Sequence, residues 1–388
     1  MLKLYIHLRR FVAVLIGIFL LSTGLLKLMD PEGTRLIVTE YFKFFHLQFL
    51  QPVAKVTGIL LALLESAVGV ALITGVMRKV AAWITLWMLG LFTILTLVLW
   101  LVNPEMDCGC FGEAYHLTHL QSLLKNVVLL LLAAFAFMPM RHLGTPRPRR
   151  KVAAWVAWAT LIAATIYCNR HIPLVDFTEF STGAELFASE NTGSSVQDSY
   201  QSAYIYEKDG KQESFTLDRL PDSTWVFVKV DTLYRNTSEK ERPILSFRDA
   251  EGEYQDELAA QGRVVVFSVY EPSKAPWEKL RERCQAVVEA GARPLLIVTS
   301  LPEETALQGL QAYIADYKTL ITMNRDNGGA TYFENGELIA KWGVRDFPKN
   351  PSEDLRADTV DLSTHISAKK RIQAQGFCLF LGAVLILL

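Results

Sequence analysis

The sequence predicts a multi-domain membrane protein, in which an α-helical transmembrane bundle is followed by an α/β soluble domain. Five apolar runs lie within the first 172 residues, and each approaches the ~20 residues needed to cross the hydrocarbon core of a bilayer. Only seven of the 40 acidic residues fall in that part of the chain, so the second part is the water-soluble one. The second part also alternates strand and helix patterns, as α/β domains do.

Basic residues flank the apolar runs and predict their orientation. We expect spans at 11–28, 53–76, 81–102, 121–140 and 152–168. The N-terminus, the Arg78-Lys79 turn and segment 141–151 are basic, so the positive-inside rule places them in the cytoplasm. The loop at 29–52, the loop around Cys108 and the chain after the fifth span then face outward. This arrangement predicts a protein of the bacterial inner membrane with a periplasmic soluble domain.

A last apolar run, from Gly376 to the terminus, is short for a span. Lys369, Lys370 and Arg371 precede it on the side that the orientation above places outside, which conflicts with the positive-inside rule. The sequence therefore leaves open whether this tail lies in the membrane interface or forms a weak sixth span.

The chain divides into five predicted segments. They are a four-helix transmembrane domain (1–140), a basic cytoplasmic loop with the fifth helix (141–172), a linker with an accessory β segment (173–244), an α/β soluble domain (245–350) and a tail with a short apolar segment (351–388). In the soluble part we expect, in order, a hairpin at 203–217, strands at 224–234 and 263–270, a helix at 277–290, a strand at 294–300, a helix at 303–317 and a closing hairpin around Asn335-Gly336.

Three features of the first 140 residues carry a resemblance to a known family. They are the segment Ser22-Thr23-Gly24-Leu25-Leu26-Lys27, Glu65 within the second apolar run, and Asp107-Cys108-Gly109-Cys110-Phe111-Gly112 followed by Lys125-Asn126. This region resembles the DoxX-like membrane family, and more closely its MauE-type branch. The resemblance implies a four-helix core, an association with methylamine utilisation and a role in assisting disulfide-rich or redox proteins outside the cytoplasm.

Residues 245–347 carry a second resemblance. Their Asn327-Gly328-Gly329-Ala330-Thr331 and Asn335-Gly336-Glu337 segments look like the closing hairpin of a thioredoxin-like domain of the TlpA type. A redox-active member would carry Cys-x-x-Cys soon after the strand at 263–270, but the segment 271–277 has no cysteine. The family's proline before the hairpin is also absent. We therefore expect this domain to bind a client without exchanging thiols.

The Cys108-Gly109-Cys110 pair is the strongest candidate for chemistry. The glycine lets the chain bend enough to bring the two sulfurs together, and the strained disulfide of so small a ring would be readily reduced. The start of the fourth helix near residue 119, together with Lys125, would favour the reactive thiolate. Cys168 ends the fifth run on the same predicted side and is a candidate resolving thiol. We therefore predict that Cys108, Cys110 and Cys168 are catalytic in thiol exchange.

The same segment has two other interpretations. Cys108, Cys110, His116 and His119 supply two thiolates and two imidazoles within twelve residues. This set of ligands suits Zn or Cu(I), although the spacing is not that of a standard zinc finger. Alternatively, the cysteines form a structural disulfide or remain buried thiols that hold the loop in place.

Glu65 lies inside an otherwise apolar run, where an ionisable side chain is costly and marks a candidate functional residue. It would pair with Lys27, carry protons or hydrogen-bond a quinone; otherwise it would be a protonated side chain bonded between helices. Lys27 on its own would extend to the outer surface, and Asn126 would bond across helices. We group Glu65, Lys27 and Asn126 as a predicted intramembrane polar site.

These observations predict a membrane thiol-redox or maturation factor that exchanges electrons with a periplasmic client protein or a membrane quinone. Two other classes stay open: a non-catalytic scaffold that binds a lipid or a partner subunit, and a small-molecule carrier with its site at Glu65. The net charge of −1 and the position of the basic segments beside apolar runs give no indication of a nucleic-acid partner.

Overall fold

The computed structural model describes residues 2–104, 106–138, 148–186, 201–208, 211–215, 225–233, 244–302, 307, 309–355 and 359–387. The contacts divide the chain into two compact units, one made of Met1–Ala184 with Leu245–Leu388 and the other of Glu185–Ile244. The first unit contains the helices of the apolar runs and a mixed sheet, and the second contains a small sheet of its own.

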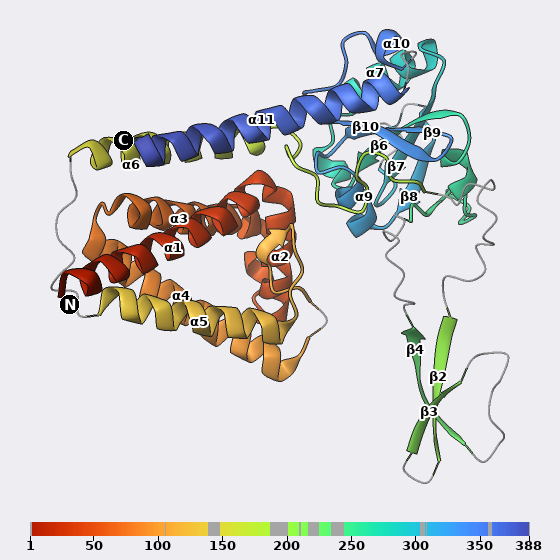
Figure 1. The fold of residues 1–388 in the computed structure, drawn as a ribbon. Helices are drawn as coiled ribbons and strands as arrows, with labels where there is room; N and C mark the ends of the chain where they lie inside the picture. Colours follow the sequence, from red (N-terminus) through yellow and green to blue (C-terminus); the bar gives the residue numbers. More distant parts are fainter. Residues whose placement is uncertain are drawn as a thin grey trace. The chain divides into compact units, whose positions relative to one another are not determined.

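Five long helices coincide with the predicted spans. They are α1 (Leu2–Met29), α3 (Ala54–Thr74), α4 (Arg78–Val102), α5 (His119–Phe137) and α6 (Pro148–Cys168). Among the described residues, these five helices are long and apolar enough to cross a membrane. Figure 1 shows α1, α3, α4 and α5 packed against one another, and α6 packs on α3. The chain is therefore a membrane protein, as the sequence predicts.

Helices α1 and α3 approach closely because glycines line their contact. A Cβ atom built on Gly69 would lie 2.6 Å from the backbone nitrogen of Leu21 and 2.7 Å from the backbone oxygen of Gly17. A Cβ atom on Gly24 would lie 2.2 Å from Ser66 Oγ. Small residues let transmembrane helix backbones approach in this way. The close contact brings polar side chains of α1 and α3 within reach of each other.

The segment 29–52, predicted to be an outer loop, is largely helical instead. It contains α2 (Pro31–Phe44) and a 3₁₀ helix, η1 (Gln48–Val53). Asp30 caps α2 by accepting a hydrogen bond from the backbone N–H of Gly33 at 2.9 Å. Pro31 occupies the first helical position, where its fixed φ and missing N–H favour a helix start. The prediction was wrong because it considered only the length of apolar runs.

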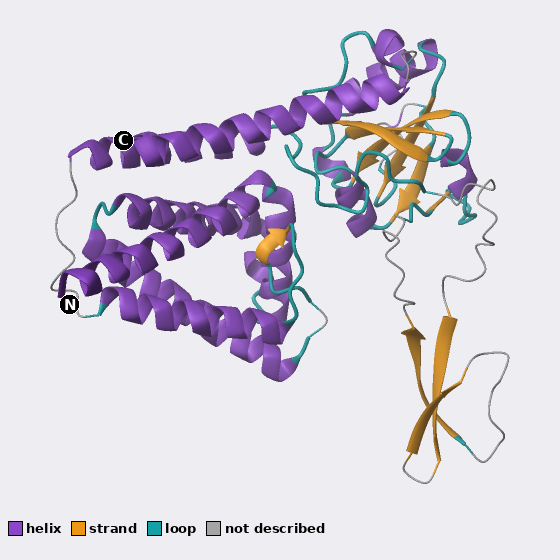
Figure 2. Cartoon of the chain, viewed as in Figure 1, coloured by secondary structure: helices purple, strands orange, loops and turns teal. Residues whose placement is uncertain are grey.

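The C-terminal part of the first unit, which we call the sheet region, is built on a mixed sheet of six strands. The strands are β5 (Phe247–Arg248), β6 (Arg263–Val269), β7 (Arg293–Val298), β8 (Ala312–Ala315), β9 (Gly329–Glu334) and β10 (Glu337–Trp342), in the order β10-β9-β6-β7-β8-β5. Strands β6, β7 and β8 are parallel, and β9, β10 and β5 run antiparallel to their neighbours. Figure 2 shows helices beside this sheet; they include α7 (Trp277–Glu289) and α9 (Tyr317–Met323). The core between α7 and the sheet includes Leu280 and Cys284.

The helix predicted at 303–317 is wrong in its second half, and residues 303–306 and 308 of its first half lie outside the described residues. Residues Ala312–Ala315 form β8, which pairs with β7, and helix α9 begins only at Tyr317 after the capping residue Asp316. A short apolar run has no periodicity that separates a buried strand from a helix. The neighbouring strand β7 supplies the hydrogen bonds that make this run a strand.

The second unit contains three antiparallel strands, β2 (Gln201–Lys208), β3 (Lys211–Phe215) and β4 (Val226–Leu233), in the order β3-β2-β4. The pairing of β2 with β3 confirms the hairpin expected at 203–217, although its turn residues Asp209 and Gly210 lie outside the described residues. Strand β4 corresponds to the strand expected at 224–234.

The C-terminal apolar run is part of a much longer helix than the sequence predicts. Helix α11 spans Thr359–Leu387 and packs along α6. Leu381 and Val384 are buried in one cluster with Ala153, Ala157 and Leu161 of α6. The tail therefore contacts the same helix that precedes the soluble part.

Candidate functional site

The DCGCFG segment runs into the short strand β1 (Cys110–Glu113), which packs on α1 and α2. Gly109 has φ +61°, and a Cβ atom at this position would lie 2.3 Å from Ile37 Cγ2 of α2. Both the positive φ and the close approach require glycine here. The Tyr41 hydroxyl of α2 donates a hydrogen bond to the backbone oxygen of Cys108 at 2.8 Å. Helix α2, absent from the prediction, is therefore what positions the cysteine segment.

Cys108 is paired with a histidine. Its Sγ lies 3.0 Å from His119 Nδ1, while His119 Nε2 lies 3.0 Å from the backbone oxygen of Pro104. A carbonyl oxygen only accepts, so Nε2 carries a hydrogen and Nδ1 of the neutral ring is left to accept the thiol proton. The three groups form the arrangement of nucleophile, base and orienting acceptor that activates a nucleophile.

The surroundings of Cys108 act in opposite directions on its ionisation. Burial raises the pKa of the Cys108 thiol above its usual value, while Ser122 and Lys125 favour the thiolate. Helix α5 begins at His119, where Thr118 and Gln121 form a capping box. The positive end of this helix also favours a nearby thiolate. Burial is the largest of these effects and favours the neutral thiol, whereas His119 offers a base beside it.

The other two cysteines of the predicted site differ in their surroundings. Cys110 is half-buried and follows Cys108 after one glycine. Cys168 is buried at the end of α6 and lines a cavity together with Asp30 and Arg325. All five cysteines of the chain are free thiols in this structure. Cys168 thus belongs to the cavity, whereas Cys108 and Cys110 belong to the loop.

The alternative metal site is not assembled in the described part of the chain. His116 Nδ1 lies 3.1 Å from Asp107 Oδ2 at an exposed position, and only His119 approaches a cysteine. No group of three or more His, Cys, Asp or Glu side chains that could hold a metal ion occurs among the described residues. Coordination by Cys108, Cys110, His116 and His119 would require His116 to leave Asp107.

Glu65 and Lys27 form a buried ion pair. Lys27 Nζ lies 2.6 Å from Glu65 Oε2, and the Thr23 hydroxyl donates to Glu65 Oε1 at 2.6 Å. Lys27 therefore does not extend to the outer surface as the sequence suggests for an isolated lysine, because Glu65 offers a partner across the close α1–α3 contact. A Cβ atom on Gly112 would lie 3.7 Å from Lys27 Cγ. The cysteine loop consequently covers the pair on one side.

Asn126 is buried in α5 and bonds across the bundle, as predicted. Its Nδ2 donates to the backbone oxygen of Phe92 and to Thr96 Oγ1 of α4, both at 3.2 Å. Among the described interactions, Asn126 bonds to α4 and not to Glu65 or Lys27. The predicted polar site is therefore an ion pair between α1 and α3 and a separate hydrogen-bonded contact between α4 and α5.

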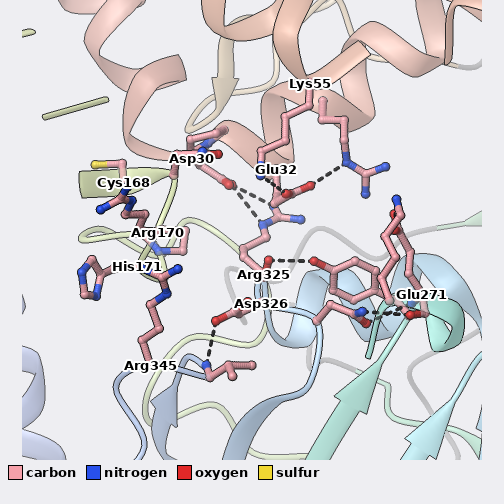
Figure 3. A pocket seen from close by; sticks show the side chains of 18 of the residues that line it. Asp30, Glu32, Lys55, Cys168, Arg170, His171, Glu271, Arg325, Asp326 and Arg345 are labelled. Carbon is pink, nitrogen blue, oxygen red and sulfur yellow. Dashed lines mark hydrogen bonds and ion pairs between the residues drawn. The ribbon is translucent and has the colours of Figure 1, made fainter. Parts of the chain in front are cut away.

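A cavity of about 1150 Å³ lies where α2, η1 and the end of α6 meet the sheet region. In Figure 3, Asp30, Glu32 and Lys55 of the helical part face Arg325, Asp326 and Glu271 of the sheet region, with Cys168, Arg170, His171 and Arg345 to one side. The Arg325 guanidinium contacts Asp30 Oδ2 at 3.0 Å and Glu113 Oε2 at 3.8 Å. Because Glu113 ends β1, this contact connects the cysteine loop to a wall of the cavity.

The class of protein is thus a membrane protein whose helical bundle carries the additional helix α2 and a cysteine loop. Residues 5–139, from α1 to α5, match the family model described as methylamine utilisation protein MauE. This match confirms the resemblance of the transmembrane part to MauE-type proteins. Residues 200–235 match a model described as a domain of unknown function, DUF8463. No curated protein and no solved structure matches the chain.

Sequence reasoning included His119 only as a metal ligand and missed its place beside Cys108. The start of α5 at Thr118 predicts that His119 lies in the first helical turn, but the pairing depends on the backbone oxygen of Pro104, which no side-chain pattern encodes. Asp30 and Arg325 were also missed. The sequence Asp30-Pro31-Glu32 is a helix-start signal that would have revealed α2.

Proposed function

We propose that the protein is a membrane thiol oxidoreductase, or a maturation factor acting through thiol exchange, and that Cys108 is its nucleophile. The observation that carries the proposal is the 3.0 Å contact between Cys108 Sγ and His119 Nδ1, with His119 oriented by Pro104. A buried thiol with a base in hydrogen-bond reach is the general arrangement of an activated nucleophile.

The reaction is an exchange of one disulfide for another. His119 takes the Cys108 proton, and the thiolate attacks one sulfur of a client disulfide, which forms a mixed disulfide and releases the other client sulfur as a thiolate. That thiolate takes the proton from His119. Cys110 then attacks Cys108 Sγ and loses its own proton to solvent, so that a Cys108–Cys110 disulfide forms and the second client sulfur leaves. Two electrons pass to the client; the reverse sequence oxidises a client dithiol.

In this proposal Cys168 and the sheet region contact the client protein. Cys168 lines the large cavity and would be the thiol that meets a client bound there. The β6–α7–β7 unit beside the antiparallel β9–β10 hairpin is compatible with a thioredoxin-like arrangement, and the segment after β6 has no cysteine. The sheet region would then hold the client without reacting, and its attachment to the bundle raises the client's effective concentration near the loop. A membrane quinone would accept the electrons in the oxidising direction.

The arrangement of basic residues supports a topology with the cysteine loop in the periplasm. Arg9 and Arg10 near the start of α1, Arg78 at the start of α4 and Arg150 at the start of α6 line one small cavity. Lys27, beside the cysteine loop, lies near the other end of α1. By the positive-inside rule the arginine end is cytoplasmic and the loop faces outward.

An alkylation-shift assay in intact cells tests the proposal. A membrane-impermeant thiol reagent is applied with and without mild reductant to the natural protein and to Cys108→Ser, Cys110→Ser and Cys168→Ser. We expect labelling to increase after reduction in the natural protein. We expect Cys110→Ser to accumulate a mixed disulfide with a client, because the resolving thiol is missing.

Cys378→Ser is the matched control, because Cys378 is an exposed cysteine of α11 remote from the loop in sequence. It should leave labelling and trapping unchanged. Thiols at 108 and 110 that are fully labelled without reductant, together with an absence of any mixed disulfide in Cys110→Ser, would contradict the proposal and favour a non-catalytic scaffold. If Glu65→Gln instead abolishes uptake of a small molecule while the cysteine variants do not, the protein is a carrier.

A further inference from the structure

Four arginines lie close together at the end of the bundle where α1 begins. Arg10 donates to the backbone oxygens of Leu72 and Ile73 in the last turn of α3. Arg9 Nε donates to the backbone oxygen of Ala136 in the last turn of α5 at 3.0 Å. Helix C-termini carry partial negative charge, so these positions are favourable for guanidinium groups. These contacts explain where Arg9 and Arg10 lie, and the two printed bonds of Arg10 use only two of the five N–H donors of its guanidinium group.

Two of the guanidinium groups converge on one glycine. Gly75 ends α3 with φ +75°, and a Cβ atom built there would lie 2.8 Å from Arg78 Nε and 3.2 Å from Arg10 Nη2. Arg78 Nε also donates to the backbone oxygen of Gly75 at 3.0 Å. Like charges this close repel, unless a negative charge lies between or beside them.

Arg150 is the fourth cation, and helix capping does not explain its position. It lies in the first turn of α6, which begins at Pro148, where the helix dipole disfavours a positive charge. Arg150 has no hydrogen-bond or ion-pair partner in the part of the chain that the structure describes. The segment 139–147 that precedes it contains no acidic residue. A helix N-terminus with an unpaired arginine is instead suited to hold an anion.

The four arginines line one cavity of about 210 Å³. Apart from the four arginines and His7, its described lining residues are apolar or glycine, and none of them is a carboxylate. One side of this lining is apolar, and the cavity lies at the ends of helices that are long enough to cross a membrane. This combination of cations and apolar walls occurs at the depth where lipid phosphates lie.

We propose that this arginine cavity binds a phosphate group, held by Arg10, Arg78 and Arg150. The planar guanidinium fork matches phosphate oxygens through paired hydrogen bonds. The phosphate belongs either to the headgroup of an anionic lipid, whose chains would lie along the apolar wall, or to a soluble phosphate compound. This inference does not rest on the thiol exchange proposed above.

Native mass spectrometry of the full chain tests the inference. The protein is reconstituted in nanodiscs of phosphatidylcholine with increasing phosphatidylglycerol, and lipid retained after release is measured. We expect selective retention of phosphatidylglycerol, and we expect Arg150→Gln to weaken it about tenfold, as loss of a charge-assisted contact does. Arg149→Gln is the matched control, because Arg149 is exposed, adjacent in the same helix turn and not part of the cavity lining.

A second measurement identifies the source of the phosphate. Pyrophosphate is added to the protein in phosphatidylcholine nanodiscs, and the unfolding midpoint of the natural protein and of Arg150→Gln is compared. A rise in the midpoint of the natural protein that Arg150→Gln removes, without selective lipid retention, supports the soluble source. The inference is overturned if neither phosphatidylglycerol nor pyrophosphate distinguishes Arg150→Gln from Arg149→Gln.

Discussion

At the scale of single residues, the proposed chemistry depends on the base His119 as well as on the Cys-Gly-Cys spacing. The Cys-Gly-Cys spacing could be predicted to be chemically interesting from the sequence alone. The base could not, because its orientation depends on the backbone oxygen of Pro104, fifteen residues earlier. The sequence offered Lys125 and a helix start as activating groups, and both contribute around Cys108.

The pH dependence of Cys108 reactivity follows from these surroundings. Burial raises the pKa of its thiol, so in a Cys110→Ser background we expect alkylation to speed up with pH through and beyond about 8.5, the usual cysteine value. His119→Gln removes the base that takes the thiol proton and would then donate to the thiolate. It should slow labelling at neutral pH by about tenfold for each unit of further pKa rise.

Stopped-flow or quenched alkylation with iodoacetamide measures this rate. His116→Gln is the control, because His116 is in the same segment but contacts Asp107. Equal rates for His119→Gln and His116→Gln would show that His119 has no part in activating the thiol.

At the scale of elements, apolar length predicted the five long helices well, and strand alternation predicted most of the sheet. Two elements were mispredicted for opposite reasons. Helix α2 is amphipathic and too polar to be detected as a span, although Asp30 and Pro31 mark its start. Strand β8 is a strand because β7 lies beside it, which the isolated segment does not reveal. The close contact of α1 and α3 brings Lys27 to Glu65 and depends on several glycines. No single one of these glycines in the sequence predicts the contact.

A pair of glycine substitutions tests that contact. Gly69→Ala should destabilise the protein by about 1–3 kcal/mol, as overpacking does, because its Cβ atom would lie 2.6 Å from the Leu21 backbone nitrogen. Gly90→Ala in α4 meets nothing within 4 Å and should be neutral or stabilising. The unfolding midpoints of both variants are measured in the same detergent. Equal midpoints would mean that α1 and α3 can move apart to accept the added methyl group without loss of stability.

At the scale of the whole molecule, charged contacts connect the helical part to the sheet region within the first unit. The buried pair Asp30–Arg325 and the bond between Arg35 and the Tyr317 hydroxyl link α2 to the sheet region. Neither link could be predicted from the sequence, since the partners are almost three hundred residues apart and each is an ordinary polar residue in its own segment.

Breaking the buried pair on one side should be costly. Arg325→Gln leaves Asp30 buried without its cationic partner, and we expect a loss of about 3–5 kcal/mol. The double variant Asp30→Asn/Arg325→Gln should recover part of that loss, because no unpaired charge remains. Lys274→Gln, which breaks the exposed Lys274–Glu271 pair, should change stability by about 0–1 kcal/mol. Thermal unfolding of the four proteins gives the comparison; a double variant no better than Arg325→Gln would mean that the charge of Asp30 is not what matters.

Helix α11 gives the sheet region a second attachment. Its Leu381 and Val384 are buried against the same α6 that leads into the soluble part. A protease that cut once at exposed Arg170 would leave the sheet region joined to α11, and a cut at exposed Lys349 would leave it joined to α6. Shedding of the soluble part from the membrane therefore requires two cleavages, and a single nick leaves every fragment in place.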